Sequence, residues 1–304
     1  MRHTTPDALE ASVTQSTRPT RSSRGDLPPG VGVVGLGAMG GPIARHLAGA
    51  RVPTVVVDLD PAAVAAAVAV GATAVHEAAA VAEAAGTVIV VVATDDQLRE
   101  VLTGRRGVYS AARPGSVVLL SSSALPETCR ELAAAAPPGV SVLDAALTGG
   151  VRAAEAGELT LLVGGDAEAL DAVRPVLTPW TSAVHLLGDV GAGQVGKTVN
   201  NLVHWAQISA LGQALELGRR LGGDVPRLRA ALQDSPTDSR TLREMHEMRF
   251  TWFEKDIANA ERMAAGTGVE LTMTQTALAF MRTFDIAAAR RLLDGDDPGL
   301  YSRV

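Results

Sequence analysis

Short, uninterrupted apolar runs recur along the first half of the chain and restrict its fold more than any other feature. The clearest of these runs are residues 31–35, 54–57, 88–93, 116–120, 140–146 and 159–164. Runs without polar alternation are typical of strands that are buried on both faces. Helical patterns separate most of them, and strand–helix repetition predicts a mainly parallel, doubly wound α/β sheet.

A glycine-rich turn follows the first apolar run and precedes a helical segment. Its G-x-G-x-x-G pattern consists of Gly35, Leu36, Gly37, Ala38, Met39 and Gly40. In such a pattern the first glycine permits the tight turn, the second lets a pyrophosphate approach the backbone, and the third lets helix and strand pack closely. The helix start offers free N–H groups and a partial positive charge to phosphates. Because a strand–helix–strand unit surrounds it, the pattern predicts a dinucleotide-binding domain.

Asp58 ends the second predicted strand, about 20 residues beyond Gly37, where such domains carry an acidic residue that binds the adenosine ribose. A 2′-phosphate at this position would meet the negative charges of Asp58 and Asp60. No Lys or Arg lies between residues 59 and 77 to balance them. We therefore expect NAD to be preferred over NADP. The plainer alternative is that Asp58 is a solvated carboxylate at a strand end.

From about residue 191 onward the strand signals end and helical patterns replace them. The helical segments are expected at residues 194–221, 225–232, 242–248, 255–265 and 274–293. We predict a Rossmann-type NAD-binding domain over residues 31–190 and an all-helical domain over residues 191–304. The glycines between residues 188 and 193 are expected to loosen the chain at this boundary.

Residues 1–30 differ from the rest because they are rich in Thr, Ser, Arg, Pro and Gly and lack apolar periodicity. They contain no continuous apolar segment of the kind found in secretory signals. We interpret them as a flexible tail. An organelle transit segment is the alternative, although Asp7, Glu10 and Asp26 interrupt its expected composition.

Charge and cysteine content exclude several other classes of protein. The net charge of −6 gives no electrostatic signature for nucleic acid, and no apolar run approaches the ~18–20 residues of a membrane helix. We thus expect no nucleic-acid and no membrane partner. The single cysteine, Cys129, excludes an internal disulfide framework, and the histidines show no metal-ligand spacing. We expect no metal, and a cytoplasmic location.

Four segments follow one another in an order that is characteristic of a known family. They are VGVVGLGAMGGPIARHLA, DAALTGGVRAAEAGELTLLVGG, GAGQVGKTVNN and EKDIANA. Together they resemble the cofactor, substrate, catalytic and second cofactor segments of the β-hydroxyacid dehydrogenases, the family of 3-hydroxyisobutyrate dehydrogenase and tartronate semialdehyde reductase. The resemblance covers residues 31–304. Thr148 stands where the family usually has Ser, and Glu158 stands where it usually has Thr.

The resemblance implies the fold class, the reaction and the assembly. The fold would be like that of 6-phosphogluconate dehydrogenase, with a Rossmann domain and an all-α domain. The reaction would be hydride transfer between a small β-hydroxy acid, similar to 3-hydroxyisobutyrate, and NAD or NADP. Two subunits of the family interlock through the helical domain, which also serves substrate binding, so the resemblance implies a homodimer or homotetramer.

Lys197 is the candidate catalytic residue within the third segment. Oxidation of an alcohol requires a hydride acceptor, which NAD supplies, and a base that takes the hydroxyl proton. Burial beside the cofactor and a helix dipole would lower the lysine pKa from its usual ~10.4 towards neutrality. Asn201 lies four residues later on the same helix face and can orient the substrate, with Asn200 as the alternative. The resemblance assigns the same acid–base role to the matching lysine.

Two further groups of residues lie where the predicted sheet ends. Thr148, Gly149 and Gly150 follow a strand and form a small cradle of N–H groups and a hydroxyl, and the resemblance implies that it binds the substrate carboxylate. Ser122 and Ser123 end the fifth strand, at the edge where such sheets bind ligands. The resemblance implies that Ser122 contacts substrate and Ser123 contacts cofactor. A plain turn and a helix cap are the alternatives.

Lys255 belongs to the fourth segment, in the predicted helical domain. The resemblance implies that this lysine reaches back to the cofactor and closes the cleft. A solvated charge pair with Asp256 is the alternative.

Two other functions remain open beside the dehydrogenase. Imine reductases share the architecture but commonly lack a lysine at the catalytic position, so Lys197 argues against that activity. A catalytically silent, NAD-binding interaction module is the third hypothesis. Loss of the lysine would be its mark, and this chain retains it.

Overall fold

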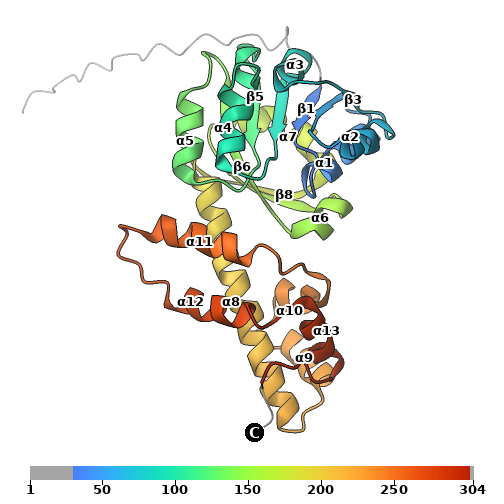
Figure 1. The fold of residues 1–304 in the computed structure, drawn as a ribbon, viewed down its shortest axis with the longest axis vertical. Coiled ribbons are helices and arrows are strands. Elements are labelled where there is room, and N and C mark those ends of the chain that lie inside the picture. Colours follow the sequence, from blue (N-terminus) through green and yellow to red (C-terminus); the bar gives the residue numbers. More distant parts are fainter. Residues whose placement is uncertain (1–29, 302–304) are drawn as a thin grey trace, which may run out of the picture.

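The computed structural model describes residues 30–301, so the predicted tail lies outside the described residues except for Gly30. A layered α/β part and a smaller helical part are joined by one long helix, α8 (Figure 1). This helix, Ala192–Arg220, begins at the sheet and runs through the centre of the helical part. The arrangement confirms a Rossmann-type α/β part followed by a helical part.

The α/β part is built on one eight-stranded sheet in the order β3-β2-β1-β4-β5-β6-β7-β8. The strands are β1 (Val31–Val34), β2 (Thr54–Val57), β3 (Thr73–Ala74), β4 (Thr87–Val90), β5 (Val117–Leu120), β6 (Ser141–Thr148), β7 (Leu159–Gly164) and β8 (Thr181–Gly188). All neighbouring strands pair in parallel except β6 and β7, which are antiparallel. The expected mainly parallel sheet is therefore confirmed.

Helices cover both faces of this sheet. They are α1 (Gly40–Gly49), α2 (Pro61–Val68), α3 (Ala78–Ala84), α4 (Asp95–Thr103), α5 (Pro126–Ala134), α6 (Gly150–Ala156) and α7 (Ala167–Leu177), with short 3₁₀ turns η2 (Val108–Ser110) and η3 (Thr178–Trp180). Successive strand residues point to opposite faces, so β1 contributes Val33 to the core under α1 and α7 and Val34 to the core under α4 and α5.

The last strand of the sheet escaped prediction from the sequence. β8 lies at the sheet edge, and most of its side chains are partly or fully exposed. An edge strand has no second neighbour and needs no continuous apolar run, so the signal on which the other strands depend is weak here. Its two consecutive leucines, Leu186 and Leu187, are 40% and 47% exposed.

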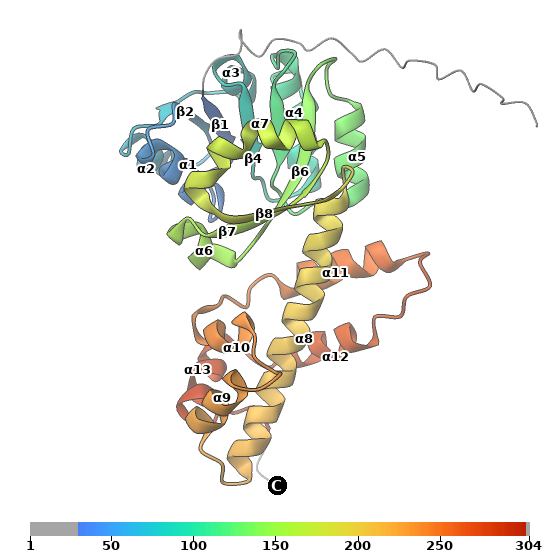
Figure 2. The same cartoon turned by 180° about the vertical axis from the view of Figure 1, so that it is seen from behind.

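The helical part packs around α8 (Figure 2). Its helices are α9 (Val225–Gln233), α10 (Arg240–Glu244), the 3₁₀ turn η4 (Met245–Glu247), α11 (Phe253–Ala264), α12 (Thr272–Met281) and α13 (Ile286–Asp294). Trp205, Ile208, Phe280 and Phe284 belong to its core. The single helix expected over residues 274–293 is wrong, because Asp285 caps α13 by accepting a hydrogen bond from the Ala288 amide and the chain breaks before it.

Candidate active site

A cleft of about 1150 Å³ lies between the carboxyl edge of the sheet and the helical part. Both parts contribute to its walls. The residues singled out from the sequence that line it are Gly37, Ala38, Met39, Ser122, Ser123, Thr148, Gly149, Gly150, Lys197, Asn201 and Lys255. The fold thus brings five stretches, far apart in the chain, to one place. Gly35, Leu36, Gly40 and Asp58 lie in or beside the glycine-rich turn and not in the cleft wall.

The three glycines of the turn meet three different surroundings. A Cβ on Gly35 would lie 2.1 Å from the Val91 carbonyl oxygen, and one on Gly40 would lie 2.0 Å from the Gly35 carbonyl oxygen. Gly35 also has a φ of 91°, which favours glycine. A Cβ on Gly37 would meet no atom within 4 Å. Gly37 therefore presents open backbone to the cleft, at the start of α1, where a pyrophosphate fits.

Asp58 is held against this turn by backbone amides. Its carboxylate accepts hydrogen bonds from the Leu36 amide and, at 2.8 Å, from the Asp60 amide. Asp60 in turn caps α2 through the Ala62 amide. The carboxylate thus lies beside the turn at the end of β2, where a dinucleotide ribose would lie. The glycine-rich turn and this carboxylate therefore fit a bound dinucleotide.

Lys197 projects from the second turn of α8 into the cleft. Its Nζ donates a hydrogen bond of 2.6 Å to the Leu147 carbonyl oxygen at the end of β6. Loss of solvent around the amine lowers its pKa, Asp256 opposes this effect, and Lys255 adds to it. The lowered pKa agrees in direction with the prediction from the sequence. A lysine in such surroundings exchanges a proton more readily than one on the surface.

Asn201 lies on the same face of α8, one turn beyond the lysine, and is buried. Its Oδ1 accepts a hydrogen bond of 3.0 Å from Asn200, and its side chain hydrogen-bonds the carboxylate of Asp256. Trp205 also donates to Asp256, at 3.1 Å. Desolvation raises the pKa of Asp256, although Lys197 and these donors oppose the rise. An acidic group therefore lies behind the candidate base, held by α8 and α11.

The Thr148 hydroxyl, expected from its motif to help bind the substrate carboxylate, is hydrogen-bonded to the protein backbone instead. It donates a hydrogen bond of 3.2 Å to the Thr160 carbonyl oxygen on the neighbouring strand. Gly149 and Gly150 have φ values of 106° and 71°, and Gly150 begins α6. The backbone N–H groups at this helix start, together with the open space at Gly150, are what this turn offers to an anion.

The loop after β5 is held from two sides. The Ser122 hydroxyl accepts a hydrogen bond of 2.8 Å from the Val92 amide, and the Ser122 carbonyl oxygen accepts one of 3.0 Å from Gln194 on α8. Ser123 lies in the cleft wall. The hydroxyl of the neighbouring Ser121 is buried and has no partner among the described residues. Ser122 therefore ties the loop to the end of β4, and its carbonyl ties the loop to the lysine-bearing helix.

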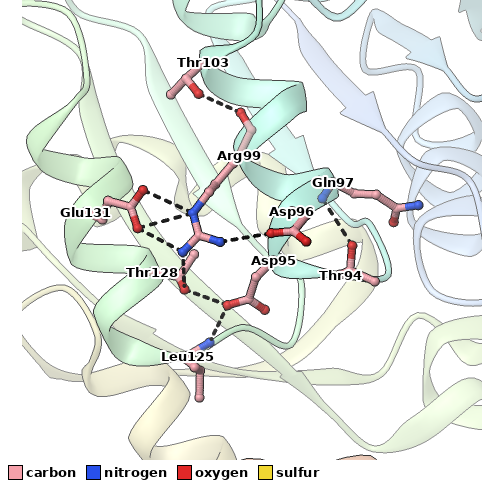
Figure 3. A network of polar contacts seen from close by, with 9 residues as sticks. All are labelled: Thr94, Asp95, Asp96, Gln97, Arg99, Thr103, Leu125, Thr128 and Glu131. Atoms are coloured by element: carbon pink, nitrogen blue, oxygen red, sulfur yellow. Dashed lines mark hydrogen bonds and ion pairs between the residues drawn. The ribbon is translucent and has the colours of Figure 1, made fainter.

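A polar network fixes the far end of the same loop (Figure 3). Asp95, at the start of α4, accepts hydrogen bonds from the Leu125 amide and the Thr128 hydroxyl. Arg99 then joins α4 to Glu131 on α5, with a closest approach of 2.9 Å. Hydrogen bonding and charge attraction lower the pKa of Glu131. Exposed ion pairs contribute little stability, so we interpret the network as a device that positions the loop.

Two basic side chains join the α/β part to the helical part across the cleft. Lys255 on α11 donates a hydrogen bond of 2.8 Å to the Ala93 carbonyl oxygen, just beyond β4. Arg152 on α6 forms ion pairs with Glu244 and Glu247, the second at 3.2 Å. Lys255 therefore spans the cleft to the end of β4, and its contact with the cofactor stays a prediction.

Several residues in the cleft wall or behind it carried no assignment from the sequence. Asp144 and Gln194 fix the start of α8, and Arg152 joins the two parts of the chain. His204 hydrogen-bonds Thr241 at 3.0 Å, and burial lowers its pKa to about 4. Asp144 opens the quoted substrate segment, so its position in a motif was a signal. Gln194 and Arg152 also lie within quoted segments, whereas His204 and Thr241 lie outside all four, and only the folded chain brings these two together.

Two further searches concern the described part of the chain. Among residues 30–301, no group of three or more His, Cys, Asp or Glu side chains is arranged to hold a metal ion. None of the helices there combines the length and the apolar character that a bilayer crossing requires.

The fold and the cleft define a dinucleotide-binding protein with the architecture of 6-phosphogluconate dehydrogenase. Residues 30–188 match the family model described as the NAD binding domain of 6-phosphogluconate dehydrogenase. Residues 191–297 match the model described as the NAD-binding domain of NADP-dependent 3-hydroxyisobutyrate dehydrogenase. The chain belongs to the β-hydroxyacid dehydrogenase family of oxidoreductases.

Curated relatives and solved structures agree with this membership. The chain is 37% identical over 193 residues to 2-(hydroxymethyl)glutarate dehydrogenase of Eubacterium barkeri, covering 63% of this chain and 64% of that relative. It is 35% identical over 206 residues to 3-hydroxyisobutyrate dehydrogenase of Pseudomonas aeruginosa, covering 67% and 69%. The matched stretch therefore spans just under two thirds of the first relative and slightly more of the second. The structure of 3-hydroxyisobutyrate dehydrogenase of Mycobacterium tuberculosis with L-serine superposes with a TM-score of 0.77 at 27% identity, covering 90% of this chain and 98% of that one.

Imine reductases share the fold. The enzyme of Myxococcus stipitatus, with NAD⁺ bound, superposes with a TM-score of 0.63 at 18% identity, over 89% of this chain and 97% of that one. At this identity the likeness shows a common architecture and carries no evidence on the reaction.

Proposed function

We propose that the chain is an NAD-preferring dehydrogenase of small β-hydroxy acids, in which Lys197 is the general acid and base. The observation that carries the proposal is the position of the Lys197 amine. It lies in the cleft that the glycine-rich turn also lines, and desolvation lowers its pKa. The relatives act on hydroxy acids by their names, which supports this class of substrate.

The proton is handled by residues of α8. In the direction of oxidation, neutral Lys197 takes the proton of the substrate hydroxyl, and in reduction the ammonium returns it to the carbonyl oxygen. NAD, when bound, accepts the hydride. The Leu147 carbonyl oxygen accepts a hydrogen bond from Nζ and so orients the amine. Asn201 lies one turn away, where its amide can position the substrate.

The substrate carboxylate is proposed to bind at the Gly149–Gly150 turn. Positive φ values at both glycines place the backbone of this turn at the cleft wall. Because Thr148 gives its hydrogen to Thr160, we assign anion binding to the backbone amides rather than to that hydroxyl. Ser123 and Lys255 are proposed to contact the cofactor, and Ser122 to shape the substrate end of the same wall.

The proposed preference for NAD depends on Asp58. Two backbone amides hold its carboxylate beside the glycine-rich turn, and Asp60 adds a second negative charge. A 2′-phosphate would therefore meet like charges. In the Asp58→Ala variant we expect the ratio of kcat/KM for NAD to that for NADP to fall by about tenfold, equivalent to about 1.4 kcal/mol. An unchanged ratio in steady-state assays would remove Asp58 as the selecting residue.

The test of the reaction is a panel of β-hydroxy acids, their semialdehydes and cyclic imines, assayed with NAD and NADP. We expect turnover of a hydroxy acid with NAD and a loss of about 10²–10⁴ in kcat for Lys197→Ala, which removes the acid–base group. The matched control is Lys255→Ala, whose loss should appear mainly in the KM for NAD. Turnover of imines alone would favour the imine reductase. Binding of NADH without turnover of any compound would favour the silent module.

We also propose that the helical part forms a homodimer or homotetramer. α8 exposes Val195, Val199 and Val203 one turn apart, at 42%, 56% and 53%. The pair α11–α12 extends away from α8, and Val269 and Met273 near its tip are 61% and 71% exposed (Figures 1 and 2). Exposed large apolar side chains, here on one face of α8 and near the tip of the α11–α12 pair, are typical of an interface. Light scattering should give at least twice the chain mass, and a monomer at working concentration would contradict the proposal.

The domain division and the location remain proposals as well. We propose domains over residues 31–190 and 191–304, the first for NAD and the second for substrate and assembly.

The cytoplasm is the proposed location, because the one cysteine, Cys129, is buried and unpaired, and burial raises its pKa. Cell fractionation tests the location, and recovery of the protein outside the cytoplasm would overturn it.

A further inference from the structure

The start of α8 is built around a buried carboxylate that the proposed reaction does not use. Asp144 lies in the middle of β6 and is fully buried. Its Oδ1 accepts a hydrogen bond of 2.8 Å from the Gly191 amide, and its Oδ2 accepts one of 2.9 Å from the Gln194 amide. These are N–H groups that a helix start leaves without helical partners.

The glycines around Asp144 are matched to the carboxylate. A Cβ on Gly164 would lie 2.2 Å from Asp144 Oδ1, and a Cβ on Gly193 would lie 2.7 Å from Oδ2. Gly191 has a φ of 101°, which favours glycine. The expectation that glycines loosen the chain here is therefore wrong, because Gly191 and Gly193 allow the helix start to close tightly on the strand.

The same contact extends to the loop that follows β5. Gln194, whose amide binds Asp144, accepts a hydrogen bond of 3.3 Å from the Ala124 amide and donates one of 3.0 Å to the Ser122 carbonyl oxygen. Both Asp144 and Gln194 are buried. The helix start is thus joined to β6 and to the loop bearing the predicted ligand residues.

Lys197 on α8 also contacts β6. It lies three positions after Gln194, which is close to one helical turn. Its amine donates to the Leu147 carbonyl oxygen, three residues along β6 from Asp144. One strand therefore holds the helix at two points, its start through a carboxylate and its lysine through a carbonyl.

We infer that Asp144 is a positioning residue, which fixes the first turn of α8 so that the Lys197 amine has one place and direction in the cleft. The inference rests on the proposed function for its effect on the rate, and on the hydrogen bonds of the helix start for its structural part. A carboxylate accepts from both amides at once. An asparagine of the same shape offers one oxygen and turns an N–H₂ group towards the second amide.

The test compares Asp144→Asn with Asp166→Asn. Asp166 also caps a helix that follows a strand of the same sheet, since it accepts a hydrogen bond of 2.8 Å from the Ala169 amide at the start of α7, but it is exposed and remote from the cleft. For Asp144→Asn we expect kcat to fall by about 10–100-fold, as for a small misplacement of a catalytic group, with the KM for NAD changed less than about threefold. For Asp166→Asn we expect both constants to stay at their wild-type values.

Amide hydrogen exchange of residues 191–197 supplies a readout that needs no substrate. We expect faster exchange there in Asp144→Asn, and exchange as in the wild type in Asp166→Asn. If the wild type turns over no hydroxy acid, the proposed function fails while the exchange data still decide the positioning role. Wild-type kcat together with wild-type protection in Asp144→Asn would overturn the inference. Equal losses in kcat and NAD affinity would also overturn it, because they would indicate general damage to the cleft.

Discussion

Two helix starts in this chain carry closely spaced glycines after a strand, and they use them in opposite ways. At the start of α1, Gly37 faces open space, since a Cβ there would meet no atom within 4 Å. At the start of α8, a Cβ on Gly193 would lie 2.4 Å from the Leu162 carbonyl oxygen and 2.7 Å from the Asp144 carboxylate. The first helix start is open to an anion from outside the chain, and the second is filled by an anion from the chain itself.

The comparison shows what a glycine pattern by itself leaves open. A helix start has N–H groups without partners inside the helix, and a negative charge can satisfy them. Where the protein supplies that charge from a buried strand residue such as Asp144, the result is a fixed helix. Where no side chain fills the space, as at Gly37, the backbone stays open to a ligand, and we propose that this ligand is the dinucleotide. The surroundings of the glycine, rather than its spacing, decide between the two.

The largest expected effect is the destabilisation caused by burying the charged Asp144 carboxylate at the start of α8. Burial raises the pKa of Asp144 from 3.8 to about 6, so between these pH values the folded chain binds more protons than the unfolded chain. The free energy of unfolding should therefore fall as pH rises through this window, by about 3 kcal/mol from this group. Urea unfolding of the wild type and of Asp144→Asn at several pH values measures the difference. Parallel curves for the two proteins would show that the carboxylate is not desolvated.

The second effect is steric. Gly193→Ala should lower the free energy of unfolding by about 1–3 kcal/mol, because backbone oxygen and a buried carboxylate crowd the new methyl group. Gly49→Ala, at the end of α1, is the matched control, since a Cβ there meets no atom within 4 Å and stability should stay the same or rise slightly. Chemical unfolding of both variants provides the measurement. Wild-type stability in Gly193→Ala would contradict the view that Gly193, unlike Gly37, has no space for a side chain.

The smallest effect sharpens the comparison at the open site. Gly37→Ala should leave the free energy of unfolding unchanged, since the methyl group has space, but should raise the Kd for NAD about tenfold, or about 1.4 kcal/mol. The reason is that a pyrophosphate approaches this backbone closely. Fluorescence titration with NADH and a parallel unfolding curve separate the two quantities. An unchanged Kd would mean that the dinucleotide does not lie over Gly37.

Much of the fold follows from local pattern. The central strands, for example β1 and β5, are buried throughout and stand out as continuous apolar runs. β8 does not, because an edge strand with exposed Leu186 and Leu187 obeys no such rule. The division of residues 274–293 into α12 and α13 was also missed, since a capping aspartate, Asp285, interrupts an otherwise continuous helical pattern.

Some residues of the candidate site could likewise be predicted from the sequence, and others could not. The glycine-rich turn, Asp58, Lys197 and Asn201 lie in recognisable motifs, and the fold brings them to one cleft or to its margin. The orientation of Thr148 could not be foreseen, because its hydrogen bond goes to Thr160 on a strand paired through tertiary folding. Contacts such as Arg152 to Glu244 join residues with no shared motif.

The sequence by itself determined the class of fold, the dinucleotide turn and the lysine, because each depends on spacing along a single strand or helix. Tertiary structure decided which N–H groups stay open and which are satisfied. Asp144 lies 50 residues before Gln194, and the carboxylate meets that amide only when β6 and α8 pack together. Burial then raises the pKa of Asp144 and lowers that of Lys197, since desolvation arises only in the packed chain.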